Sequence, residues 1–313
     1  MKVIIENVSK NRDKWLALKE KTVGSSEIGV ICGVSQWSTP LELWGQKTGR
    51  LARDAENDAM WLGTKLQPVV GELFCKKTGI AIAEPDCMYA HPTHEWATAT
   101  PDYFAFPDVS SGEQRVLEIK TTSARAAASW DEGNAPTLAY MQTVWQLGVL
   151  GLNQGYIAAL IGGQDFRSVD VEFQSPLFEQ MLHMASQFMK CIETDTPPAA
   201  KADDVRILDE LRRLEDRTVH LPPETIADVL EFNRVQEQIK TLKNELKILD
   251  KTAAKHRVAI EQLMGNASRG LLGKYEIVLN KVERKSYVVE PSSYTTFKVK
   301  ELEHETDGAG LGA

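Results

Sequence analysis

The sequence is poor in cysteine and has no long apolar run. Its four cysteines lie far apart and form no Cys-x-x-Cys pair. This spacing argues against a zinc knuckle or an iron–sulfur cluster and fits reduced thiols. No stretch approaches the ~20 apolar residues of a membrane span. Residues 1–15 also lack the apolar core of a signal peptide, so we expect a soluble, cytoplasmic protein without membrane contacts.

An overall excess of positive charge is absent too, since the formal net charge is −8 at pH 7. The charge is uneven along the chain. Residues 232–300 hold 14 Lys and Arg against 7 Asp and Glu, whereas the remainder holds 22 against 37. A basic segment on an acidic body is compatible with local contact to phosphates, and equally with a solvated helix. Net charge therefore decides no function here.

The first part of the chain alternates between helical and strand patterns. Its 313 residues, 42% of them apolar, suffice for a substantial core and for more than one domain. We expect helices that start at Ser25 and Thr39 and helices over 59–78, 136–150 and 175–192, the last capped by Ser175. Strands are expected up to Asp102 and over 116–120, 155–161 and 168–173. This order predicts an α/β (α+β) core with a mixed sheet flanked by helices.

The second part of the chain reads as a helical extension. The Pro-Pro pair at 197–198 marks a boundary, which gives domains over 1–196, 197–268 and 269–313. A short helix is expected at 204–214 and a long one over 224–265, where apolar residues recur in 4-3 steps typical of a coiled-coil seam. The row comprises Val235, Ile239, Leu242, Leu246, Leu249, Ala253, His256, Ile260 and Leu263. Residues 275–279 and 287–289 predict a small β-hairpin, followed by a disordered tail.

Acidic residues and a lysine meet on one predicted hairpin. Because side chains alternate along a strand, Glu118 and Lys120 share a face and Ile119 points the other way. A turn over residues 105–115 would bring Asp102 beside Glu118. Carboxylate oxygens suit Mg²⁺ or Mn²⁺, and a lysine can orient or deprotonate an attacking water. The alternative is a solvated hairpin face without a ligand.

Four stretches of the sequence stand out in chain order: residues 15–28, residues 33–49 (similar to S-x-x-x-T-P-x-x-L-W-x-x-K-T-G), Pro101-Asp102 with 118–120, and 140–147. Together and in this order, they resemble the YqaJ-like viral recombinase family, relatives of the phage lambda exonuclease in the PD-(D/E)XK nuclease superfamily. The resemblance covers about residues 10–190. It implies a PD-(D/E)XK nuclease core.

The same resemblance implies roles for individual residues of the hairpin and the following helix. Asp102 and Glu118 would bind Mg²⁺, for which Mn²⁺ would substitute, with the carbonyl of Ile119 as a further ligand. Lys120 would position or activate the attacking water. Gln142 would lie beside the site and hold the lysine or the water.

Residues near the N-terminus would contact DNA if the resemblance holds. Ser26 and Thr100 resemble the hydroxyl residues that meet the 5′-phosphate, and Lys19 stands where lambda-like members place an arginine. Arg12 is a further candidate, against the alternative of an ordinary surface arginine. One departure concerns Gln67, since the family has a glutamate there and glutamine is a poorer cation ligand, which argues against a second metal.

The family resemblance therefore implies a Mg²⁺-dependent exonuclease that degrades linear duplex DNA 5′→3′ from ends with a 5′-phosphate. The resulting 3′ strands would pass to a single-strand annealing protein during phage recombination. A homo-oligomer, a trimer by resemblance, acting in the cytoplasm of a bacterial host and encoded by a phage or prophage, is expected. Two alternatives stay open: an endonuclease of restriction or structure-specific type, and a DNA-end-binding scaffold with weak nuclease activity.

Overall fold

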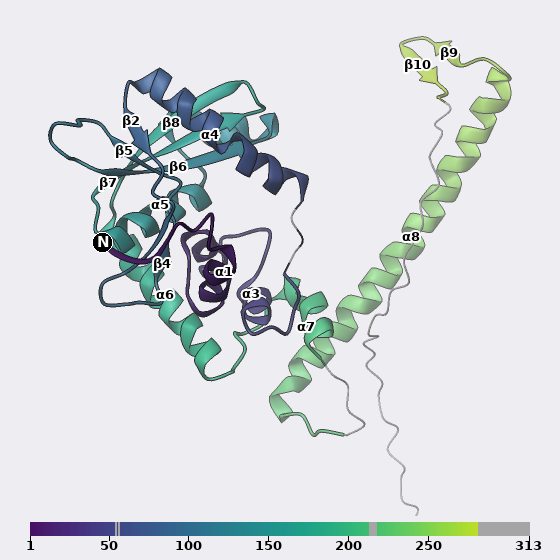
Figure 1. Cartoon of the computed structure of the whole chain (residues 1–313). Helices are drawn as coiled ribbons and strands as arrows, with labels where there is room; N and C mark the ends of the chain where they lie inside the picture. The colour runs from purple at the N-terminus through teal and green to yellow at the C-terminus, as the bar shows by residue number, and fades with distance from the viewer. Residues whose placement is uncertain (54, 56, 213–217, 281–313) are drawn as a thin grey trace, which may run out of the picture. The chain divides into compact units, whose positions relative to one another are not determined.

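The computed structural model describes residues 1–53, 55, 57–212 and 218–280, and the chain forms two compact units, 1–213 and 214–313 (Figure 1). The division falls later than the expected boundary at residue 196. The reason is that a short helix, α7 (Val205–Leu211), still packs on α3 (Pro40–Lys47). Its Ile207 is buried in the core of the first unit.

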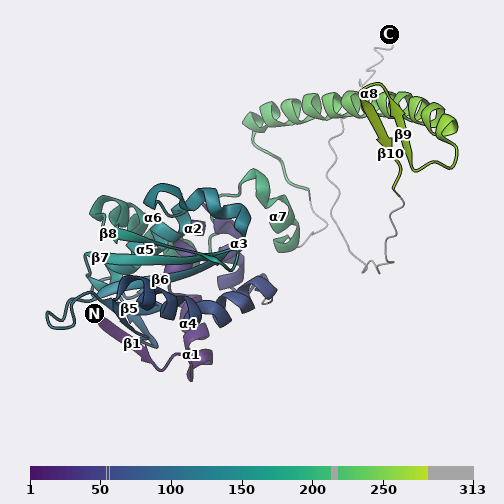
Figure 2. The ribbon, with the colours of Figure 1, turned by 90° about the horizontal axis from the view of Figure 1, so that it is seen from above.

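The first unit is built on a five-stranded mixed sheet in the order β2-β5-β6-β7-β8 (Figure 2). The strands are β2 (Ala81–Ala83), β5 (Tyr103–Phe106), β6 (Arg115–Thr122), β7 (Gln154–Ile161) and β8 (Asp165–Glu172). β6 and β7 are parallel, and the other neighbours are antiparallel. A parallel pair needs a crossover, which α5 (Thr137–Leu150) supplies. The predicted α/β core with a mixed sheet is confirmed.

Helices cover both faces of this sheet. One face packs on α4 (Asp58–Thr78), whose Val70 and Phe74 meet Leu117 and Ile119 of β6. The other face packs on α5 and α6 (Ser175–Glu193), and there Val116 of β6 joins the larger core. The alternation of β6 therefore leaves Glu118 on the α5 side, as the sequence predicted. α6 differs in one detail, because Gln174 is its N-cap and Ser175 is its first residue.

A second, three-stranded sheet was not expected from the sequence. It has the order β1-β3-β4 and consists of β1 (Lys2–Glu6), β3 (Cys87–Ala90) and β4 (Thr98–Ala99). Beside it, the bridge between Val23 and Ala97 anchors the turn that leads into the 3-10 helix Ser25–Glu27 and α2 (Ile28–Ile31). One prediction is corrected here: Asp102 precedes β5 rather than ending a strand.

A buried ion pair holds this same turn in place. Lys47, at the end of α3, lies 2.9 Å from Glu27 with its side chain inaccessible to solvent. Its Nζ also donates to the carbonyls of Lys19 and Thr22 at 2.5 and 2.7 Å, and Glu27 accepts from the Gly24 N–H at 2.9 Å. Burial lowers the pKa of Lys47, and the charge of Glu27 opposes that effect. The Lys-Thr-Gly motif therefore fixes the segment that carries Ser25 and Ser26.

The second unit contains the predicted long helix, α8 (Ile226–Met264), preceded by the 3-10 turn Pro223–Thr225. Most of the 4-3 apolar row on α8 is exposed in this unit, including Leu242 and Leu249, and the coiled coil stays a prediction. After α8, β10 (Tyr275–Val278) pairs with β9 (Arg269–Leu272). The predicted partner at 287–289, and the predicted tail, lie outside the described residues. Within the described part of the chain, no helix is long and apolar enough to cross a membrane.

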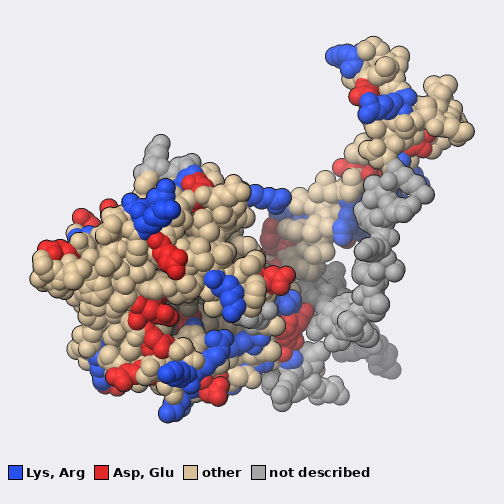
Figure 3. All heavy atoms as spheres, turned by 45° about the horizontal axis from the view of Figure 1, so that its top comes forward, with Lys and Arg blue, Asp and Glu red and all other residues tan. Residues whose placement is uncertain are grey.

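Charges of both signs are interspersed over the first unit. On the face that Figure 3 shows, Lys and Arg lie among Asp and Glu, and several Lys and Arg side chains lie close together along the lower part of the unit.

The Lys47–Glu27 pair yields a stability prediction. Lys47→Met should lower the free energy of unfolding by about 3–5 kcal/mol, because it leaves Glu27 buried without a counter-charge. The double variant Glu27→Gln/Lys47→Met should recover part of that loss. Urea unfolding measures both, and Lys190→Met, at an exposed position of α6, should change stability by less than about 0.5 kcal/mol. Equal stability of Lys47→Met and Lys190→Met would contradict the assignment.

Candidate active site

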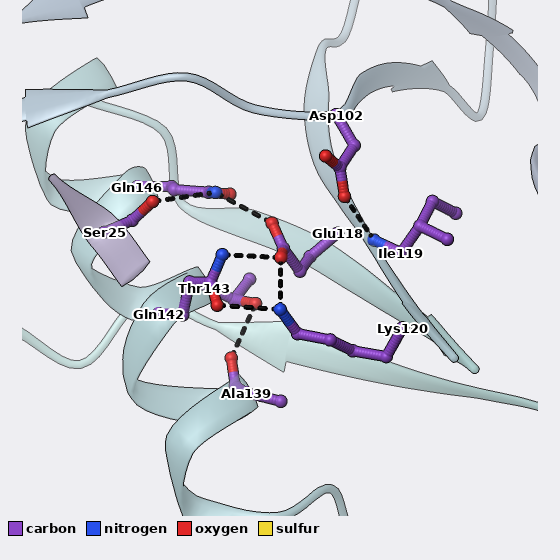
Figure 4. A network of polar contacts seen from close by, with 9 residues as sticks. All are labelled: Ser25, Asp102, Glu118, Ile119, Lys120, Ala139, Gln142, Thr143 and Gln146. Atoms are coloured by element: carbon purple, nitrogen blue, oxygen red, sulfur yellow. Dashed lines mark hydrogen bonds and ion pairs between the residues drawn. The ribbon is translucent and has the colours of Figure 1, made fainter. Parts of the chain in front are cut away.

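The site centres on the Glu118 carboxylate in the middle of β6. Glu118 is 3% exposed, and Lys120, two residues on, points to the same face. Lys120 Nζ donates to Glu118 Oε1 at 2.7 Å (Figure 4). The strand periodicity thus places the acid and the lysine as the sequence predicted.

Two glutamines of α5 approach this pair from the next layer. Gln142 Nε2 donates to Glu118 Oε1 at 2.5 Å, and Gln142 Oε1 accepts from Lys120 Nζ at 2.8 Å. Gln146, one turn further along the same helix face, donates from Nε2 to Glu118 Oε2 at 2.8 Å and to Ser25 Oγ at 3.3 Å. The predicted Gln142 therefore lies where the resemblance implied. Gln146 and Ser25 were missed, although the four-residue spacing of the two glutamines was visible in the sequence.

Asp102 reaches the site through the register of the hairpin. Because Tyr103 pairs with Leu117, Asp102 lies opposite Glu118, one position beyond the last registered pair. Its Oδ2 accepts from the backbone N–H of Ile119 at 2.8 Å. The structure thus brings Asp102, Glu118 and Lys120 together on two neighbouring strands, with Gln142 of α5 on the third side.

The charges at this site influence one another strongly. Burial, followed by the nearby charge of Glu118, raises the pKa of Asp102 well above its ordinary value. Burial alone would lower the pKa of Lys120, but the charge and hydrogen bond of Glu118 outweigh it, so the pKa of Lys120 is raised. Lys120 is therefore a charged donor in this arrangement, which suits orienting a water or a phosphate oxygen.

The donor set fits a single divalent cation better than two. Asp102 keeps Oδ1 without a partner among the described residues, and Glu118 Oε2 accepts only from Gln146, so both acids have a free lone pair. The buried Glu118 and the partly buried Asp102 share one ammonium, which leaves an uncompensated negative charge that a hard cation would neutralise. No cluster of three or more His, Cys, Asp or Glu suited to a metal occurs in the described part of the chain.

Gln67 lies on the side of α4 that faces the sheet. A Cβ at Gly63 would stand 3.5 Å from the Thr121 hydroxyl, and one at Gly71 would stand 3.3 Å from the Tyr103 ring. Gln67 is one helical turn from each glycine, so it lies between these two levels of the sheet. It is half-buried, and no hydrogen bond joins it to Asp102 or Glu118 among the residues that the structure describes.

The predicted DNA-contact residues fall into two places. Lys19 stacks its ammonium on the Trp15 ring at 4.8 Å, and Trp15 Nε1 donates to the Thr100 hydroxyl at 3.3 Å. Ser26 is exposed and lines a cavity of about 670 Å³ together with Lys120 and Gln142. Lys19 and Thr100 are thus linked to each other, and Ser26 is linked to the acid–lysine centre.

Arg12 stands apart from these groups. It is the first residue of α1 (Arg12–Lys21) and is exposed. Its side chain makes no hydrogen bond or ion pair with any other described residue. The structure therefore brings Arg12 to neither group.

The fold and the site together define a mixed α/β protein with a buried carboxylate, lysine and glutamine centre. Residues 14–153, which contain every residue of that centre, match the family model of the YqaJ-like viral recombinase domain. This match confirms the resemblance that the motifs indicate.

The chain is similar to other proteins over most of its length. The uncharacterized protein YqaJ of Bacillus subtilis (strain 168) is 26% identical over 296 residues, which cover 90% of this chain and 89% of that protein. The structure of an alkaline exonuclease (LHK-Exo) from Laribacter hongkongensis matches with a TM-score of 0.49 and 17% identity, over 59% of this chain and 94% of that one. A phage related exonuclease from Haemophilus somnus 129PT matches with a TM-score of 0.39 and 13% identity, over 55% and 94%.

The raised pKa of Asp102 yields a prediction on stability and pH. Because this pKa is higher in the fold than in the unfolded chain, the contribution of Asp102 to stability is full below the unfolded-chain pKa. It is lost as the pH rises through the raised value. Asp102→Asn removes that loss and should raise the free energy of unfolding at pH 8 by about 1 kcal/mol, with a smaller gain at pH 4.

Urea unfolding of Asp102→Asn at both pH values measures this gain. Asp108→Asn is the matched control, because hydrogen bonds from Ser110 lower the pKa of Asp108, which is exposed. That variant should gain nothing at pH 8. A lower stability of Asp102→Asn than of the wild type at pH 8 would contradict the electrostatic account.

Proposed function

We propose that this protein is a metal-dependent DNA exonuclease that degrades linear duplex DNA 5′→3′ from ends with a 5′-phosphate. The observation that carries the proposal is the network of Asp102, Glu118, Lys120 and Gln142 inside a YqaJ-like viral recombinase domain. The names of the structural relatives, an alkaline exonuclease and a phage related exonuclease, agree with it. The resulting 3′ strands would serve recombination by strand annealing in the cytoplasm of a bacterial host, with the gene carried by a phage or prophage.

Each residue of the site would have a separate role in phosphodiester hydrolysis. Asp102 and Glu118 would hold Mg²⁺ or Mn²⁺, with the Ile119 carbonyl as a further ligand, and the bound ion would supply Lewis-acid polarisation of the phosphate. Lys120, held as a charged donor by Glu118 and Gln142, would orient the attacking water and stabilise the charge that develops on the phosphate. Gln142 would keep the Lys120 ammonium in place through its Oε1.

Binding of the DNA end would rest on residues next to this centre. Ser26, in the same cavity as Lys120, would contact the 5′-phosphate, and Lys19 with Thr100 would bind neighbouring phosphate oxygens. Arg12 has no assigned contact with the DNA end, because the structure does not bring it to the other residues. A homo-oligomer and a single-strand annealing protein are the partners that we propose from the family resemblance.

The nuclease proposal predicts metal-dependent loss of linear DNA. Wild-type protein with Mg²⁺ should degrade 5′-phosphorylated linear duplex and leave covalently closed circles intact. Asp102→Ala and Lys120→Ala should each lower the rate by at least about 100-fold, in line with the loss of an electrostatic or general acid–base group. A label at either the 5′ or the 3′ end identifies the direction, since 5′→3′ action releases the 5′ label first.

The control variant for this assay is Glu72→Gln, an exposed acid on α4, which should keep the wild-type rate. Cutting of closed circles would favour the endonuclease alternative. The nuclease proposal would be wrong if the wild type shows no metal-dependent loss of DNA, or if both alanine variants degrade DNA as fast as the wild type. Binding of DNA ends without any cleavage would then favour the scaffold, which the small number of acids around Asp102 and Glu118 supports.

We expect the variant Gln67→Glu to bind the metal ion more tightly than the wild type. Gln67→Glu adds a carboxylate on the sheet-facing side of α4, so it should lower the Mg²⁺ concentration needed for half-maximal activity by about tenfold. A single added charge interaction of about 1.4 kcal/mol suffices for that change. The titration of rate against Mg²⁺ measures it, with Glu72→Gln again as the control. An unchanged titration would mean that Gln67 does not adjoin the cation.

A further inference from the structure

An indole ring stands in solvent beside the proposed active site. Trp37 is 80% exposed, the most exposed of the seven tryptophans of the chain. It lies in the segment between α2 and α3, within the residues that resemble the family motif, and neither the fold nor the proposed hydrolysis uses it. A large apolar ring so fully hydrated is unusual, because tryptophan is mostly buried in folded proteins.

The backbone holds Trp37 in this exposed position. Gly33 takes a left-handed conformation at φ +69°, and the N–H groups of Val34 and Ser35 both donate to the Gly29 carbonyl at 2.9 and 3.0 Å. The Trp37 N–H then donates to the Ser35 hydroxyl at 3.1 Å. On the other side, the Thr39 hydroxyl caps α3 through the Glu42 N–H. The segment is therefore tied at both ends, and its shape keeps the ring out of the core.

The same ring lines the cavity that holds the catalytic candidates. The cavity of about 670 Å³ is bordered by Trp37, Ser26, Lys120 and Gln142, and its volume lies within the range of small-molecule sites. Hydroxyl groups line part of the remaining wall, among them Ser25, Ser35, Ser38, Thr121 and Thr122, and apolar residues such as Trp130 and Leu138 line the rest. Trp37 also borders a second hollow of about 260 Å³, where the exposed Arg206 lies.

An exposed indole, a lysine and several hydroxyl groups around one cavity can together bind the base, the phosphate and the sugar of one nucleotide. Hydroxyl groups can donate to sugar and phosphate oxygens, and an exposed indole offers a face on which a nucleobase of any sequence can stack. Lys120 in the same cavity places the charged donor where the phosphate would lie. Arg206 lies beyond the ring, but it pairs with Glu42 and Glu210 at 3.5 and 3.3 Å, so the subsite rests on Trp37, Lys120 and the hydroxyl groups.

We propose that Trp37 is the stacking platform for a nucleobase next to the scissile phosphate, so that the cavity is a nucleotide subsite. The inference rests on the proposed nuclease function for the position of the phosphate, but the stacking itself requires only DNA binding. The subsite would read no base identity, since stacking has little sequence preference. It would grip frayed or single-stranded DNA near the end more than internal paired bases.

Binding without cleavage tests the subsite apart from the nuclease activity. The probe is a 5′-phosphorylated duplex with 2-aminopurine at the terminal positions of the strand to be cut, mixed with protein in EDTA. Wild-type protein should quench the 2-aminopurine fluorescence. Trp37→Ala should abolish the quenching and raise the Kd, measured by anisotropy, by at least about fivefold, whereas Trp37→Phe should stay within about twofold of the wild type.

Trp61→Ala is the matched control, because Trp61 is 50% exposed and lies on α4, away from this cavity lining. It should leave both quenching and Kd unchanged. In the Mg²⁺ assay, Trp37→Ala should raise KM for linear DNA with kcat within about twofold, which a general loss of folding would not produce. Thermal unfolding of Trp37→Ala should match the wild type, since an exposed ring adds little to the core.

The outcomes separate the two proposals. If the wild type lacks nuclease activity but the quenching depends on Trp37, the nucleobase subsite is supported and the nuclease proposal is wrong. If the wild type is a nuclease but Trp37→Ala leaves the quenching and the Kd unchanged, the nuclease proposal is supported and the subsite proposal is wrong. The subsite proposal would also be wrong if Trp37→Ala left DNA binding unchanged and weakened only the binding of a protein partner, such as the single-strand annealing protein.

Discussion

The burial of one carboxylate, Glu118, sets the conditions for the rest of the site. A charge in the middle of a sheet is stable only if hydrogen bonds and opposite charge replace the water that it has lost. Glu118 receives donors from Lys120, Gln142 and Gln146, so one strand and one helix must keep a fixed distance. The parallel pairing of β6 with β7 and the crossover through α5 fix that distance. The same packing therefore stabilises the fold and positions the residues of the site.

A second buried ion pair connects the N-terminal segment to the hydrogen bonds around Glu118. Lys47 and Glu27 hold the turn that presents Ser25, and Ser25 accepts from the same Gln146 amide that binds Glu118. The Oε1 atom of Gln146 is buried and accepts no hydrogen bond from the described residues. An acceptor left without a donor in such a place costs stability, so the orientation of this amide is set by Glu118 rather than by its own best hydrogen bonding.

Much of this was predictable from the sequence, for reasons that differ between residues. The period of two in β6 placed Glu118 and Lys120 on one face, and the helices expected over 59–78 and 136–150 correspond to α4 and α5. Asp102 was predicted near Glu118, but its backbone setting was wrong, because β4 is only two residues long and belongs to another sheet. Such short strands form through pairing with β1 and β3, far away in the sequence, and carry no local periodicity. The prediction that Ser175 is the N-cap was wrong for a similar reason. A serine before a proline can be either the N-cap or the first helical residue, and the local sequence does not distinguish the two.

The substitution of Gln67 for the glutamate of the family changes the electrostatics more than the shape. Burial and the nearby charge of Glu118 already raise the pKa of Asp102, and the single ammonium of Lys120 compensates only one of the two carboxylate charges. A third acid facing the sheet would increase that repulsion in the absence of a cation and strengthen the attraction in its presence. If Asp102 and Glu118 hold a cation, as we propose, a neutral glutamine at position 67 would lower the affinity for that cation and would spare the cation-free protein this repulsion. A weaker metal site and an intact fold would then be two consequences of the same residue.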